Sequence, residues 1–259
     1  MTSIEEKLEA FRRLLGIMDD LREKCPWDRK QTMASLRYLT IEEVYELADA
    51  ILEDQRQEIK KELGDILLHI VFYAKIASET NEFDITAVID SLCDKLVHRH
   101  PHIYGDVQVA DDAEVSRNWE KLKLKEGKTS VLEGVPVSLP ALVKAIRIQE
   151  KARATGFDWE EPQQVWDKVQ EEMNEFKAEE KAGHKDKMEE EFGDLLFAMV
   201  NYARFSGINP EEALEKTNKK FIRRFRYMED RVAEGGLKLT DLKLDQMDVY
   251  WNEAKSKGL

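Results

Sequence analysis

This chain of 259 residues has few of the features that mark secreted, membrane or redox proteins. It contains two cysteines, Cys25 and Cys93, which lie far apart and form no C-x-x-C pair. Such cysteine usage argues against a disulfide framework and favours a reducing compartment. No apolar run approaches the roughly 18 residues of a membrane span, and the first residues, M-T-S-I-E-E-K-L-E-A-F, lack the apolar core of a signal peptide. We therefore expect a cytoplasmic protein with no membrane partner.

Basic residues are outnumbered by acidic ones, and segments of alternating hydrophobicity are rare. Asp and Glu number 53 against 40 Lys and Arg, which gives a formal net charge of -13. A nucleic-acid backbone normally requires a net basic surface, so a nucleic-acid polymer is not an expected partner. A single nucleotide stays compatible with this charge, because a metal ion can bridge its phosphates. No segment alternates at period two for long, so the sequence predicts an all-α fold with almost no sheet.

The stretch from Lys168 to Asp194 carries acids at helical spacing. Glu171, Glu172 and Glu175 fall within about one third of a helix circumference and share a face. After a short turn that contains glycine, Glu191 and Asp194 stand three apart on the next helix. A connection this short lays the two helices antiparallel, so the five carboxylates are predicted to converge.

Convergent carboxylates need a partner, because two unit charges 4 Å apart repel by about 4 kcal/mol at an effective dielectric of about 20. Oxygen ligands without cysteine suit a hard cation, Mg²⁺ or its substitute Mn²⁺. An isolated E-E-x-x-E in a chain this charged is most often a solvated acidic face. Three further observations favour a metal site.

The first observation is apolar surface on both sides of the second acidic helix. One stripe at helical spacing is formed by Met188, Phe192, Leu195, Leu196, Met199 and Ala203. Further apolar residues follow on the acidic side, namely Phe197, Ala198 and Tyr202. Because a helix that is apolar all round is normally buried, we expect the acids to face a packed assembly.

The second observation is an internal repeat. The acids recur at a displacement of 129 positions as Glu42, Glu43, Glu46, Glu62 and Asp65. The apolar residues after them match as well, E-L-G-D-I-L-L-H-I-V against E-F-G-D-L-L-F-A-M-V. A duplication without chemistry would have little reason to preserve clustered like charges.

The third observation is the basic run K-K-F-I-R-R-F-R. Lys220 and Arg224 stand four apart on one helical face, beside the expected core anchors Phe221 and Phe225. Such residues often only pair with nearby acids. Near a metal site they also suit phosphate, because Arg offers a bidentate fork and Lys a point charge.

The repeat predicts two tandem helical domains. We expect an N-terminal domain over residues 1–125 and a C-terminal domain over 126–259 that begins with a connecting arm, 126–140, because the polar K-L-K-L-K-E-G-K-T-S marks a boundary near residue 126. Apolar periodicity predicts helices over 4–23, 33–54, 57–80 and 85–99 in the first domain, and over 140–154, 211–233 and 245–257 around the acidic pair in the second.

These residues resemble the MazG family of nucleoside triphosphate pyrophosphohydrolases. The resemblance rests on E-E-x-x-E followed sixteen residues later by E-x-x-D, present twice, and on the motifs C-P-W-D, R-H-P-H, L-E-G-V-P-x-S-L-P-A-L and K-A-x-x-x-G-F-D-W, so that it covers nearly the whole chain. It implies helical bundles that complete themselves in a homodimer, Mg²⁺ as cofactor, and hydrolysis of a nucleoside triphosphate to a monophosphate and diphosphate. In such a reaction a metal-activated water attacks the α-phosphorus.

The resemblance also implies roles for individual residues. The five C-terminal acids would bind metal. On chemical grounds one acid that is not fully committed to metal could accept the water's proton; we expect Glu172 in this role, with Glu175 as the second catalytic carboxylate. Residues at the family's nucleotide-contact positions are Lys168, Lys187, Glu190, Lys220, Arg224 and Trp251.

The two copies differ at the positions of the cations. Leu39 matches Lys168 and Glu58 matches Lys187, although Lys95 and Arg99 could take the places of Lys220 and Arg224. We therefore expect the C-terminal copy to be the main hydrolase and the N-terminal copy to be weak, specialised or structural.

Other interpretations remain open. A pyrophosphatase for a deoxynucleotide or a phosphoribosyl nucleotide fits the same acids, and a non-catalytic helical adaptor could bind a basic partner with them. A di-iron carboxylate bundle fits poorly, because that chemistry normally needs E-x-x-H, which does not occur in the sequence.

Overall fold

A computed structural model describes residues 2–111, 114–115, 118–119, 122 and 130–259. The chain divides into two compact units, Met1–Val109 and Ala110–Leu259, and each is considered by itself. The expected domain boundary near residue 126 lies outside the described residues.

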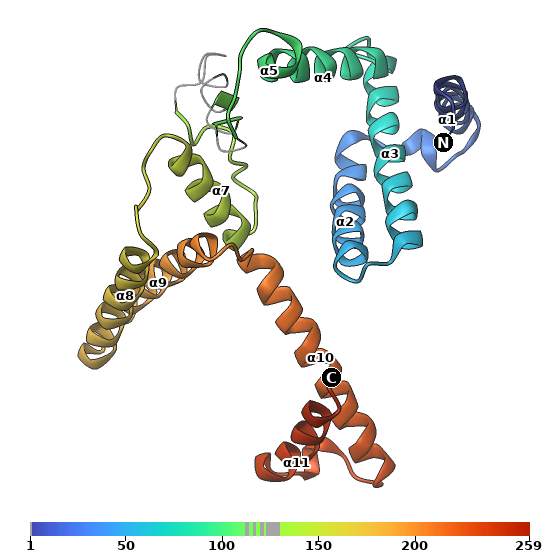
Figure 1. Ribbon diagram of the computed structural model, residues 1–259. Coiled ribbons are helices and arrows are strands. Elements are labelled where there is room, and N and C mark those ends of the chain that lie inside the picture. Colours follow the sequence, from blue (N-terminus) through green and yellow to red (C-terminus); the bar gives the residue numbers. More distant parts are fainter. Residues whose placement is uncertain (1, 112–113, 116–117, 120–121, 123–129) are drawn as a thin grey trace. The chain divides into compact units, whose positions relative to one another are not determined.

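The first unit is helical throughout its regular structure. Its elements are α1 (Ile4–Lys24), the 3₁₀ turn η1 (Asp28–Lys30), α2 (Met33–Leu52), α3 (Arg56–Glu79), α4 (Ile85–Arg99) and the short α5 (Pro101–Tyr104). Ser3 caps α1 and Thr32 caps α2, each in a capping box that satisfies two backbone donors at the helix start. Helices α2 and α3 lie side by side in antiparallel orientation (Figure 1).

The core of the first unit lies between α1, α2 and α3. Met18, Leu36, Val71 and Phe72 are almost completely buried there. Arg22 on α1 adds a polar connection to this core, because its Nε donates to Glu79 at the end of α3 (2.8 Å). The core thus fixes the register of α2 against α3, the two helices that carry the N-terminal acids.

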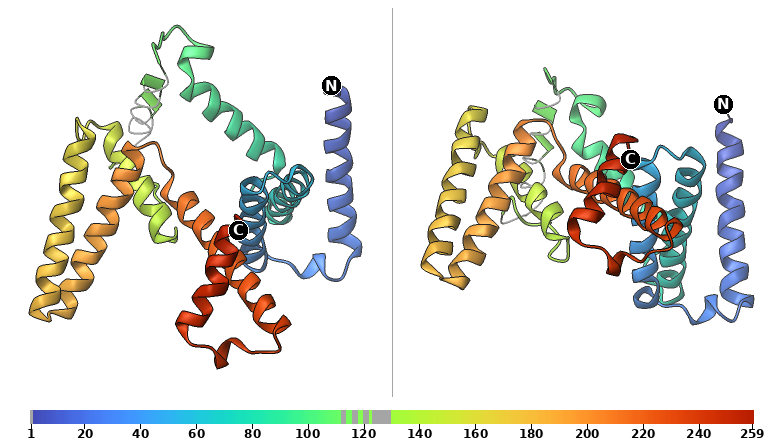
Figure 2. Two further views of the ribbon diagram at one scale, coloured as in Figure 1. Left: turned by 60° about the horizontal axis from the view of Figure 1, so that its bottom comes forward. Right: turned by 90° about the horizontal axis from the view of Figure 1, so that it is seen from below.

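The second unit repeats the antiparallel helix pair. Its elements are α7 (Ala141–Ala154), α8 (Pro162–Ala182), α9 (Lys185–Phe205), α10 (Pro210–Glu234), the 3₁₀ turn η2 (Leu239–Asp241) and α11 (Leu244–Ser256). Gly183 ends α8 in the left-handed region, with φ of 73°, where glycine carries no Cβ penalty. The chain then reverses directly into α9, and both views of Figure 2 show α8 and α9 side by side. A second pair is formed by α10 and α11.

Buried contacts hold α8, α9 and α7 together. Val169, Leu195 and Ala198 form the core between α8 and α9, with Tyr202 packed against it. The buried Gln149 of α7 donates through Nε2 to the backbone oxygen of Phe197 (2.8 Å), which ties α7 to the middle of α9.

These observations confirm the predicted all-α fold with tandem helical repeats. No strand occurs in the part of the chain that the structure describes, and the helices agree with the predicted ranges to within a few residues. Among the described helices, none is both long enough and apolar enough to cross a membrane.

Part of the apolar surface of α9 is exposed in the single chain. Leu195 and Ala198 are buried, but Phe192, Leu196 and Met199 are 45–49% exposed. Helix α8 covers one side of α9, and α7 and α10 touch others, so this stripe stays exposed among the described residues of the second unit.

Candidate functional site

Three acids meet between α8 and α9. Carboxylate oxygens of Glu172, Glu175 and Glu191 all lie within 4.8 Å of one another. Glu172 and Glu175 stand three apart on α8, and the antiparallel return through Gly183 brings Glu191 of α9 opposite them. Helical spacing and the short turn therefore produce the predicted convergence for these three residues.

The three acids differ in their exposure to water. Glu172 is 5% exposed, Glu191 is half-buried and Glu175 is exposed. The pKa of Glu191 is raised, first by burial and then by the negative charges of Glu175, Glu172 and Asp194. A cation at this position would relieve the part of the shift in the pKa that comes from like charge.

Glu171 and Asp194, the other two predicted metal acids, flank this triad. Glu171 is exposed and pairs with Lys168, whose Nζ lies 2.9 Å from its Oε1. Asp194 is also exposed and acts on Glu191 through its charge.

Lys168 is the cation nearest the C-terminal acids. Its Nζ lies 2.6 Å from Oε1 of Glu172, in addition to its contact with Glu171. These two hydrogen bonds raise the pKa of Lys168, so its ammonium is fully charged at neutral pH. Its place one turn before the acids lets it reach them from their own helix.

The first unit forms a second triad from the equivalent positions. Carboxylate oxygens of Glu43, Glu46 and Glu62 lie within 4.8 Å of one another, between α2 and α3. Burial raises the pKa of Glu43, and the charges of Asp65 and Glu46 raise it further. Glu42, the remaining predicted acid, is exposed on α2.

One residue at this triad was not predicted from the sequence. Lys61 of α3 places its Nζ 2.9 Å from Oε1 of Glu62 and 4.0 Å from Oε2 of Glu46. The signal was available in the repeat, because Lys61 stands where the second copy has Glu190. Lys61 lies on α3, whereas the position that corresponds to Lys168 lies on α2, so comparing the C-terminal cations with their counterparts does not reveal it.

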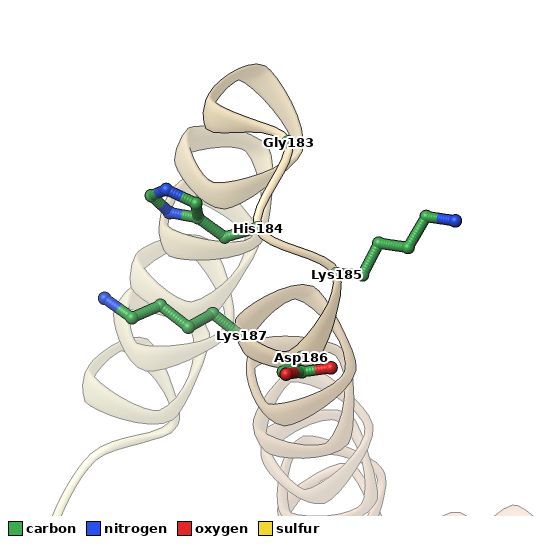
Figure 3. A pocket seen from close by; sticks show the side chains of 5 residues that line it. All are labelled: Gly183, His184, Lys185, Asp186 and Lys187. Atoms are coloured by element: carbon green, nitrogen blue, oxygen red, sulfur yellow. The ribbon is translucent and has the colours of Figure 1, made fainter.

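Two predicted nucleotide-contact residues, Lys187 and Glu190, lie on the first turns of α9. Lys187 lines an open hollow of about 430 Å³ at the α8–α9 turn, together with residues 183–186. Figure 3 shows the side chains of His184 and Lys187 extending to the same side of the turn. Both approach Glu179, with His184 Nδ1 2.7 Å and Lys187 Nζ 3.8 Å from its carboxylate. Glu190 is exposed beside the triad.

The other predicted contact residues lie on the α10–α11 pair. The guanidinium of Arg224 is 5.8 Å from the ring centroid of Trp251, and Phe221 lies 5.0 Å from the same ring. Nε of Arg224 donates to the backbone oxygen of Leu259 (2.6 Å). Lys220 is exposed on α10, one turn before Arg224. The structure thus brings the acids together on one helix pair and places this aromatic and basic group on another.

Comparison with known proteins identifies the same two segments. The MazG nucleotide pyrophosphohydrolase domain matches residues 31–104 and 160–228, which together make up more than half of the chain. These segments contain both acidic sets and also Lys220 and Arg224, whereas Trp251 lies beyond the second match.

Similar proteins extend over almost the whole chain. The nucleoside triphosphate pyrophosphohydrolase/pyrophosphatase MazG of Thermotoga maritima is 44% identical over 250 residues, covering 95% of each chain. The nucleoside triphosphate pyrophosphohydrolase of Escherichia coli K12 is 43% identical over 256 residues, covering 95% of this chain and 97% of the relative. An uncharacterized protein, YabN of Bacillus subtilis, is 48% identical over 259 residues but extends further, since the match covers 53% of it.

Proposed function

Because the chain belongs to the MazG family of nucleotide pyrophosphohydrolases, we propose that it hydrolyses nucleoside triphosphates to nucleoside monophosphates and diphosphate, in a Mg²⁺-dependent reaction. The observation that carries this proposal is the acidic triad at equivalent positions of both repeats, each with ligand oxygens within 4.8 Å of one another. The similarity of the chain to two nucleoside triphosphate pyrophosphohydrolases along 95% of its length supports the choice of substrate.

The residues of each triad fit a hard divalent cation. Carboxylate oxygens are the ligands that Mg²⁺ and Mn²⁺ prefer, and each triad includes a nearly buried acid, Glu172 or Glu62, that holds negative charge away from bulk water. Glu171 and Asp194 in the C-terminal copy, and Glu42 and Asp65 in the N-terminal copy, would complete the ligand set. When bound, the metal would offset triphosphate charge and lower the pKa of a coordinated water.

The chain's own residues would bind and orient the substrate. Lys168 and Lys187 would contact phosphate oxygens as point charges, and Arg224 with Lys220 would add further donors. Trp251 offers a ring face on which any base can stack, while Glu190 contacts the nucleotide beside the triad. Glu172 would accept the proton of the water that attacks the α-phosphorus, with Glu175 as the second catalytic carboxylate.

We also propose that the protein acts as a homodimer. The uncovered apolar residues of α9 have exposed counterparts on α3, since Leu63, Leu67 and Ile70 match Phe192, Leu196 and Met199. Each repeat thus leaves the same apolar stripe beside its acids. A second copy packed against these stripes would supply the missing layer of a bundle.

The C-terminal copy is proposed to carry most of the hydrolysis. Lys168 and Lys187 are both present there, whereas the N-terminal copy has Leu39 and Glu58 in their places. Each missing cation removes one charge-assisted phosphate contact, so the first copy would act weakly, on another substrate, or as a scaffold.

A panel of nucleoside triphosphates and their deoxy forms, assayed for diphosphate release with and without Mg²⁺, tests these proposals. Glu172→Ala/Glu175→Ala should abolish most of the release, and Glu43→Ala/Glu46→Ala should remove a minor part. Glu5→Ala/Glu9→Ala on α1, which changes two exposed acids that belong to neither triad, should retain full activity. Equal losses from the two triad pairs would contradict C-terminal dominance. Failure to release diphosphate from any triphosphate would favour a helical adaptor, and activity confined to one nucleotide would favour the narrower pyrophosphatase.

A further inference from the structure

Each acidic triad has one lysine beside it, and the two lysines come from opposite helices of the pair. Lys168 reaches its acids from α8, whereas Lys61 reaches its acids from α3, the helix equivalent to α9. At the position of Lys61 the second copy has Glu190, and at the position of Lys168 the first copy has Leu39. Each triad therefore has a lysine in contact with it, although the two lysines do not correspond in sequence.

The physical requirement behind this arrangement is the repulsion within each triad. Three carboxylates within 4.8 Å repel one another strongly where water is partly excluded. One ammonium in the cluster reduces that repulsion in the absence of metal. Duplicated local sequence would place the lysine at the same position twice, so its exchange between helices points to the charge itself as the preserved feature.

Lys61 does not complete its triad. Glu62 is 3% exposed, and its Oε2 is buried without a hydrogen-bond partner among the described residues, although its Oε1 is bound to Lys61. A buried carboxylate oxygen without a donor is costly and is open to a further cation. Lys61 is itself 61% exposed and Lys168 37% exposed, so either side chain can move into water at small cost.

We propose that Lys61 and Lys168 are built-in counter-cations, each occupying the charge position of a divalent metal ion at its triad and each displaced when that ion binds. The inference rests on the proposed metal sites and goes beyond them, because it assigns to Lys61 a role at the N-terminal copy. Metal binding then frees one ammonium next to the site in both copies, where it can turn to the phosphates of the nucleotide.

Titration of the full-length, nucleotide-free protein with Mn²⁺, followed by electron paramagnetic resonance and calorimetry, tests the proposal. Glu62→Gln and Glu172→Gln assign the binding steps to the N- and C-terminal triads. Lys61→Met should tighten Mn²⁺ binding at the N-terminal triad about three- to tenfold, and Lys168→Met should do the same at the C-terminal triad, as expected when one partly exposed ammonium is removed. Lys216→Met is the matched control, because Lys216 is also 61% exposed and pairs with Glu212 on α10, and it should change neither step.

A helix exchange provides a second test. Leu39→Lys/Lys61→Glu moves the lysine of the first copy from α3 to α2, the helix equivalent to α8. The Mn²⁺ affinity of the N-terminal triad should then fall from its value in Lys61→Met toward the affinity of the C-terminal triad. A double variant that binds as tightly as Lys61→Met would contradict the equivalence of the two positions.

The outcomes separate this inference from the proposed function. Unchanged or weaker Mn²⁺ binding in both lysine variants, with normal binding by the wild type, would overturn the counter-cation role alone. A wild-type protein that binds no Mn²⁺ at either triad would overturn both the counter-cation role and the metal-dependent function.

Discussion

The ammonium of Lys168 lies 2.6 Å from the carboxylate of Glu172, one helical turn along α8, and the carboxylate side chain is only 7% exposed. This pair places a buried negative charge and a half-exposed positive charge side by side at the proposed site. The equivalent acid of the first unit, Glu43, has Leu39 one turn before it and so has no lysine at this position on its own helix.

Loss of the Lys168 ammonium should weaken hydrolysis. We expect Lys168→Met to lower kcat/KM for a nucleoside triphosphate about 10- to 100-fold, because one charge-assisted phosphate contact is worth about 1.5–3 kcal/mol. Diphosphate release at varied substrate concentration measures the change. Lys177→Met, at an exposed lysine further along α8, should be neutral. An unchanged kcat/KM in Lys168→Met would exclude a phosphate contact by this side chain.

The raised pKa of Glu191 should make the metal-free protein less stable as the pH rises. The folded state binds this proton more tightly than the unfolded chain, so the free energy of unfolding falls as the pH rises from the ordinary glutamate pKa of 4.5 through the raised pKa. At pH 7 in a chelator, Glu191→Gln should therefore melt about 1–3 °C above the wild type, and at pH 4 the two should melt together.

Added Mg²⁺ should reverse that order at pH 7, because the wild type keeps a metal ligand that the Gln variant has lost. Differential scanning calorimetry measures both effects. Glu189→Gln, two positions before Glu191 and exposed, serves as the control. A Gln variant that melts with the wild type in the chelator at pH 7 would show that Glu191 carries no such penalty.

Removal of the Arg204 fork should destabilise the second unit. Arg204 Nη1 lies 2.9 Å and Nη2 2.5 Å from the two carboxylate oxygens of Asp158, which connects α9 to the G-F-D-W segment. Both side chains are mostly buried, at 15% and 18% exposure, so Arg204→Met should lower the free energy of unfolding by about 2 kcal/mol.

Urea denaturation measures this loss. Arg153 approaches the same carboxylate at 3.7 Å but is 60% exposed, so Arg153→Met should cost less than about 0.5 kcal/mol. Equal losses from the two variants would contradict a special role for the Arg204 fork.

Charge on the uncovered apolar stripes should prevent dimer formation. Leu67→Glu and Leu196→Glu each place a carboxylate at the centre of a stripe, where association would bury it without a partner. Sedimentation analysis should then show monomers for the double variant and dimers for the wild type. Val137→Glu, at a 90% exposed loop position, should remain dimeric. A monomeric wild type would refute the homodimer.

The sequence predicted most of the fold because most of its information is local. Amphipathic periodicity located α1 to α4 and α8 to α11, and the capping residues Ser3 and Thr32 stand where α1 and α2 begin. It also predicted the Glu172, Glu175 and Glu191 group, because helical spacing and one short turn are enough to place those residues together. What covers Phe192, Leu196 and Met199 could not be predicted, since periodicity shows that a face is apolar and not whether the same chain covers it.

By itself the sequence determined the helices, the repeat and the types of charge at each site, since these depend on neighbours three or four residues apart or on similarity at a fixed displacement. Only the tertiary structure decided which acids come within ligand distance and which lysine balances them. Lys61 contacts Glu46 across two helices, and that contact depends on how the apolar cores set one helix against the other. Helix packing is a property of the whole unit, and no local pattern encodes the distance between two side chains that it brings together.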